Sequence, residues 1–122
     1  MSKHSEYNQH VVPTTSGEPI SRKLISSYFK RLINQFYKIL PMSETNEESL
    51  PVYLDSLLVE LLGCSELINE IGNDALYLVL VNTVKYMINH PDCPRVIVRR
   101  EIFKSIDICN KFVARYTEVI NQ

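Results

Sequence analysis

Residues 20–40 read ISRKLISSYFKRLINQFYKIL and contain neither glycine nor proline. At the helical period of 100° per residue, the large apolar side chains of this stretch fall within one half-turn, which predicts an amphipathic helix. These side chains are Leu24, Ile25, Tyr28, Phe29, Leu32, Ile33, Phe36, Ile39 and Leu40. Pro41 and the acidic residues 43–49 are expected to end the helix, because proline cannot donate the hydrogen bond that a helix interior requires.

Three more helices are predicted after this one. Leucines recur at steps of three and four residues between Pro51 and Gly63, where the glycine is a plausible C-terminal cap. Residues 75–89 are apolar nearly all round, so we expect a buried helix; their β-branched side chains leave a buried strand as the alternative. A last helix over residues 95–120 is indicated by an apolar seam. The seam consists of Val98, Ile102, Ile106, Cys109, Val113, Tyr116 and Ile120.

The pattern as a whole predicts an all-α, single-domain bundle of four main helices with short loops. The chain has 122 residues, which is enough for one compact domain. Residues 1–19 are polar and rich in turn-forming types, and we interpret them as a flexible N-terminal tail preceding a bundle domain over 20–122. In an up-and-down bundle the first and last helices are neighbours.

Composition narrows the possible classes of protein. Hydrophobic residues make up 45% and charged residues 22%, as in an ordinary folded domain. The longest apolar run, residues 75–81, is far shorter than the roughly 20 residues that span a bilayer, so no membrane association is expected. The chain starts without an apolar signal stretch, which favours a cytoplasmic location and three cysteines present as thiols.

Motifs for catalysis are missing from the sequence. It has three glycines, too few for a phosphate-binding loop or a dinucleotide fingerprint, and it has no nucleophile elbow. We therefore predict that the protein is not an enzyme and uses no cofactor. His90 and Cys93 form an H-x-x-C step that Cys64 and Cys109 would have to complete as a zinc site. Structural zinc sites usually have tighter paired spacing, so no metal is expected.

Basic residues gather on two predicted helices. Residues 1–40 carry six Lys and Arg against two Glu, residues 41–92 one against nine acids, and residues 93–122 six against three. On neighbouring helices the two groups would merge into one patch for phosphates or an acidic protein, whereas an ordinary solvated surface is the simpler interpretation. The first helix contributes Lys23, Lys30, Arg31 and Lys38 with the aromatic Tyr37, and the last contributes Arg100, Lys104, Lys111 and Arg115.

The last helix also carries a second apolar edge beside its seam, formed by Ile97, Ile108, Phe112 and Val119. This edge is either part of a wide core or an exposed contact patch. As a patch, it predicts that charge reversal of Lys30 and Arg31 together with Ile108→Asp abolishes partner capture without unfolding the protein. We therefore expect a protein–protein interaction module or a subunit of a larger assembly that binds a protein partner or itself. The alternative is a nucleic-acid-associated protein that contacts the phosphate backbone through the basic residues. No small-molecule substrate is inferred.

Overall fold

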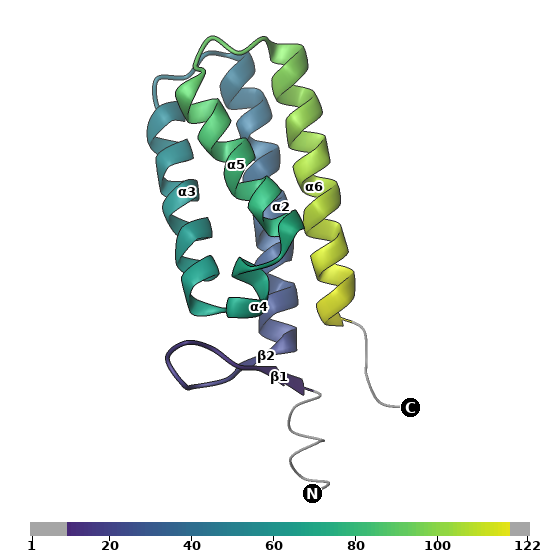
Figure 1. Cartoon of the computed structure of the whole chain (residues 1–122). Helices are drawn as coiled ribbons and strands as arrows, with labels where there is room; N and C mark the ends of the chain where they lie inside the picture. The colour runs from purple at the N-terminus through teal and green to yellow at the C-terminus, as the bar shows by residue number, and fades with distance from the viewer. Residues whose placement is uncertain (1–9, 118–122) are drawn as a thin grey trace, which may run out of the picture.

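The computed structural model describes residues 10–117. Four long helices, α2 (Arg22–Glu44), α3 (Leu50–Leu67), α5 (Ala75–Asn89) and α6 (Arg95–Thr117), run alternately in opposite directions, and the short α4 (Asn69–Gly72) joins α3 to α5 (Figure 1). The predicted all-α bundle is confirmed. Residues 75–89 form a helix and not a strand, since their apolar side chains pack against neighbouring helices on more than one side.

The helices form a ring of neighbours in which α2 packs most extensively against α6. The two lie antiparallel and side by side along their length (Figure 1). The helix α3 lies against α5, α5 against α6 and α2 against α3. The first and last helices are therefore neighbours, as an up-and-down bundle requires.

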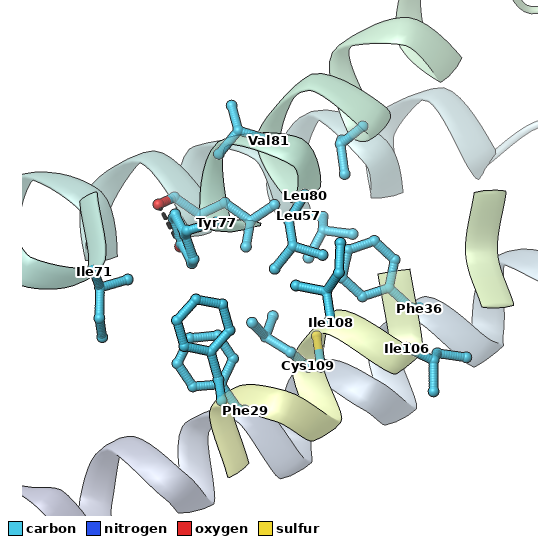
Figure 2. Close-up of a cluster of buried hydrophobic side chains, with 14 of the residues drawn as sticks. Phe29, Phe36, Leu57, Ile71, Tyr77, Leu80, Val81, Ile106, Ile108 and Cys109 are labelled. Carbon is cyan, nitrogen blue, oxygen red and sulfur yellow. Dashed lines mark hydrogen bonds between the residues drawn. The ribbon is translucent and has the colours of Figure 1, made fainter. Parts of the chain in front are cut away.

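The core contains a cluster of aromatic rings contributed by three of the helices. Phe29 of α2 and Phe112 of α6 stack with ring centroids 4.5 Å apart, and Tyr77 of α5 meets both rings edge-on at 6.1 Å. The Tyr77 hydroxyl donates to the Leu61 carbonyl of α3 at 2.7 Å, so this buried polar group is satisfied. Figure 2 shows Phe29, Phe36 and Tyr77 pointing into the space between the helices.

Two helix ends differ from their predictions. The helix α2 continues through Pro41 to Glu44. Pro41 has no N–H to donate to the Tyr37 carbonyl four residues earlier, but both residues are exposed, so water can bond that carbonyl. The Pro41 carbonyl itself accepts from the Thr45 backbone at 3.0 Å, which completes the last turn. The helix α3 continues through Gly63 to Leu67, and the backbone N–H of its C-cap residue Ile68 donates to the Cys64 carbonyl.

The segment predicted as an N-terminal tail is folded from Val11 onward. Strand β1 (Val11–Val12) pairs antiparallel with β2 (Ile20–Ser21), and the Val12 side chain is buried. The turn-forming residues 13–19 thus make the connection of a small hairpin. Its Thr15 donates from its backbone N–H to the Leu67 carbonyl at 2.8 Å and from its hydroxyl to the Glu66 carbonyl at 3.0 Å. The hairpin therefore satisfies the last carbonyls of α3. The rest of the predicted tail, residues 1–9, lies outside the described residues.

Candidate interaction surface

The predicted basic side chains of α2 are all exposed to solvent. Arg31 reaches across to α3, where its Nη2 atom lies 3.7 Å from Glu60 Oε2. Within residues 10–117, Lys23, Lys30 and Lys38 form no ion pair. These three lysines therefore leave a basic outer surface on α2.

The basic side chains of α6 are exposed as well, but two of them are engaged with acids. Arg100 Nε lies 3.4 Å from Glu101 Oε2, and Arg115 Nη1 lies 2.8 Å from Asp74 Oδ2 at the start of α5. Lys104 and Lys111 have no ion-pair partner in the part of the chain that the structure describes.

The arginines of the two basic groups turn toward different neighbours instead of meeting in one patch. Arg31 contacts α3, whereas Arg115 contacts α5. The edge at which α2 meets α6 carries aromatic side chains: the Tyr37 ring meets Phe103 edge-on, with centroids 6.2 Å apart. Tyr37 thus packs across the helix pair as well as lying beside the lysines of α2.

The second apolar edge of α6 is not an exposed patch. Ile108 and Phe112 are buried, because α6 packs against both α2 and α5 and therefore needs a wide apolar side. Ile97 is half-buried, and Val119 lies outside the described residues. The contact-patch interpretation is wrong for Ile108 and Phe112, and only Ile97 stays available for contact.

A shallow groove of about 410 Å³ runs between α5 and α6, and it brings Ile97 together with Arg100. The other lining residues are Val79, Asn82, Thr83, Tyr86 and Glu101. Tyr86 is 43% exposed and stacks on His90, with ring centroids 4.0 Å apart. His90 Nδ1 lies 2.9 Å from the Tyr86 carbonyl, which holds the two rings together. The sequence analysis missed Tyr86; its only signal was a large aromatic in the last turn of an apolar helix.

Arg115 belongs to a polar cluster that ties three helices together. Asp74 caps α5 by accepting from the Leu76 N–H at 2.8 Å and also accepts from Arg115. Burial opposes ionisation of Asp74, but the hydrogen bonds from Arg115 and the backbone outweigh it and lower the pKa of the carboxyl. Arg22 of α2 donates to the Arg115 carbonyl and lies over the Tyr116 ring at 5.0 Å. Arg115 thus has a structural role, which weakens its assignment as a binding residue.

The cysteines are separated in the structure. Cys64 and Cys93 are half-buried, Cys109 is buried, and all three are free thiols. Burial raises the pKa of the Cys109 thiol to about 12. Among residues 10–117, no three His, Cys, Asp or Glu side chains come together in a way that could hold a metal ion.

None of the described helices is both long enough and apolar enough to cross a membrane. No protein-family model, curated protein or solved structure matches this chain.

Proposed function

We propose that this protein acts by binding and not by catalysis, as a protein–protein interaction module or a subunit of a larger assembly. The groove between α5 and α6 is the contact surface, and it takes an acidic segment that carries apolar side chains. The observation that supports this proposal is the joining of Ile97, Tyr86 and Arg100 in one groove.

The apolar part of the groove offers anchoring positions. Val79 and Ile97 are half-buried and line the groove, so an apolar side chain of the partner would cover surface that is now partly wet. Tyr86 and Arg100 are exposed beside them. Tyrosine and arginine are the residue types that, with tryptophan, most often dominate binding energy at protein interfaces.

The lysines of α6 beside the groove favour an acidic partner, although Asp107 lies between them in the sequence. Lys104 and Lys111 continue from Arg100 along α6, and no described acidic residue pairs with either. The acidic member of the lining, Glu101, is already engaged with Arg100. Basic groups at the rim speed the approach of an acidic partner and disfavour a basic one.

The test uses synthetic amphipathic helices as probes, one of leucine and glutamate and a twin of leucine and lysine, with a DNA oligonucleotide as the third ligand. Fluorescence anisotropy is expected to show saturable binding of the glutamate peptide alone. The double variant Tyr86→Ala, Arg100→Glu removes this binding, whereas Lys30→Glu on the outer surface of α2 leaves it unchanged.

Three results contradict the proposal. Equal binding of both peptides shows that the groove does not select charge, and equal loss in Lys30→Glu places binding elsewhere. DNA binding that falls steeply with salt and is lost in Lys104→Glu, Lys111→Glu favours the nucleic-acid alternative, because each neutralised phosphate releases counterions.

We place this activity in the cytoplasm. The three cysteines are free and are distributed over α3, α6 and the loop between α5 and α6, as expected for thiols in a reducing compartment.

A further inference from the structure

We infer that a second site, a hollow between α2, α3 and β2, binds a small apolar molecule that carries one hydroxyl or amino group. The hollow has a volume of about 260 Å³ and lies away from the α5–α6 groove. Ile20, Ile25 and Ile68 form apolar walls. This volume is just below the usual range for ligand pockets, so the occupant is small. The inference does not depend on the proposed function.

The rim of the hollow exposes two leucines from different helices. Leu24 of α2 is 61% exposed and Leu67 of α3 is 39% exposed, and both line the hollow. A single exposed leucine is ordinary, but two that border the same apolar depression form a surface that a bound molecule would remove from water.

Two polar groups in the lining of the hollow lack partners. The Tyr28 hydroxyl and Glu60 Oε2 are buried, and neither has a hydrogen-bond partner among the described residues. The other oxygen of Glu60 accepts from Gln35 Nε2 at 3.2 Å. Oε2 lies 3.7 Å from Arg31 Nη2, an ion pair too long for a hydrogen bond, so Oε2 can still accept one from a bound molecule. Buried polar atoms are nearly always hydrogen-bonded, and those that are not call for an explanation such as a missing ligand or water. A hydroxyl group can accept from the tyrosine or donate to the carboxylate, whereas an amino group, protonated near neutral pH, can only donate to the carboxylate.

Gly63 supplies a third, independent observation. It lies inside α3 and lines the hollow, and a Cβ atom built on it would have no atom within 4 Å. Glycine destabilises a helix interior relative to alanine, and at this position no steric reason requires it. Its presence keeps the hollow open where a side chain would begin to fill it.

Cys64 offers a built-in reporter of occupancy. Cys64 lines the hollow and is half-buried. Burial raises the pKa of its thiol, and alkylation is slow because the reactive thiolate is scarce. A molecule in the hollow would slow alkylation further by blocking access to the sulfur. Cys93 is also half-buried but lies at the opposite end of the bundle, so it serves as the internal control.

The test titrates the full chain with phenethyl alcohol, phenethylamine and ethylbenzene. All three have a phenyl ring on a two-carbon chain, and they differ in whether that chain ends in a hydroxyl group, an amino group or no polar group. Binding is followed by amide chemical shifts and by the alkylation rate of Cys64 with iodoacetamide. The alcohol or the amine is expected to shift the amides of Leu24, Cys64 and Leu67 and to protect Cys64 but not Cys93. Ethylbenzene is expected to bind about tenfold more weakly, the loss of one hydrogen bond.

Two pairs of variants make the test specific. Tyr28→Phe is expected to abolish the advantage of the alcohol over ethylbenzene, whereas Tyr37→Phe on the same helix preserves it. Gly63→Leu fills the hollow and blocks all three molecules, whereas Ser56→Leu on the exposed side of α3 does not. If Gly63→Leu fails to fold, Tyr28→Phe and Glu60→Gln together decide.

The inference is overturned if none of the three molecules gives saturable shifts around the hollow. It is also overturned if Tyr28→Phe and Glu60→Gln both leave the ratio between polar and apolar probes unchanged, or if a folded Gly63→Leu protein still binds.

Discussion

Replacing Ile108 by aspartate is expected to unfold the protein. Ile108 is 5% exposed, so the change removes an apolar side chain worth about 1.5–3 kcal/mol of burial. It also places an unpaired carboxylate in the core, at a further cost of several kcal/mol. The sum is on the order of 5 kcal/mol, comparable with the roughly 5–15 kcal/mol that stabilises a whole domain. The milder Ile108→Ala leaves a cavity and costs about 2–5 kcal/mol.

Thermal unfolding followed by circular dichroism measures both changes. For a domain of this size, a loss of 1 kcal/mol lowers Tm by about 4 °C, so Ile108→Ala should melt about 8–20 °C lower than the parent. The matched control is Val96→Asp on the same helix, because Val96 is 73% exposed and its replacement should change stability by about 0.5 kcal/mol or less. An Ile108→Asp protein that melts close to the parent would refute the packing of α6 and restore the exposed apolar edge.

Three further results are expected from the same structure. Gly63→Ala should stabilise the protein by up to about 1 kcal/mol in urea unfolding, whereas Gly72→Ala should destabilise it, because its new Cβ would lie 2.3 Å from the Ser65 carbonyl oxygen. The pKa of Asp74 is lowered in the folded protein, so its ionised carboxylate stabilises the fold above the ordinary carboxyl pKa of about 3.9. This stability is lost as the pH falls through the pKa of Asp74 in the folded protein. The urea midpoint measured between about pH 2 and 5 should therefore depend less on pH in Asp74→Asn than in the parent. At about pH 8, iodoacetamide should label Cys109 only after unfolding, because its thiol is buried and has a pKa of about 12. Mass spectrometry measures the labelling, and rapid labelling of Cys109 in the native protein would contradict this expectation.

Periodicity along the chain predicted α2, α3 and α6, because each carries one apolar side. Residues 75–89 are apolar nearly all round, so their length favoured a helix while a strand stayed open. Periodicity was insufficient at the helix ends. Pro41 and Gly63 both lie inside helices, which continue beyond them to Glu44 and Leu67. The hairpin of residues 11–21 was missed because two residues per strand are too few to show alternation, and its pairing is stabilised by contacts with α3.

The binding residues were predicted less well than the helices. A helical wheel shows which side of one helix is apolar but not how many neighbours cover it, so Ile108 was assigned to a possible patch although two helices bury it. For the same reason, ion pairs between helices cannot be predicted from the helical wheel of one helix. Arg31 pairs with Glu60 and Arg115 with Asp74, although the partners are 29 and 41 residues apart in the sequence. The sequence left the exposure of the lysines of α2 and α6 open, and the structure shows that all five are exposed.

The extensive packing of α2 against α6 has a consequence for how the protein is made. The Ser26 hydroxyl bonds that of Thr117 at 2.6 Å, so this interface joins residues that are 91 positions apart in the chain. During synthesis α2 leaves the ribosome before α6 has been made, so Phe29 lacks the Phe112 ring that stacks on it in the folded protein. The bundle can close only after α6 has been synthesised, so until then the aromatic side chains of α2 that α6 covers stay exposed to solvent.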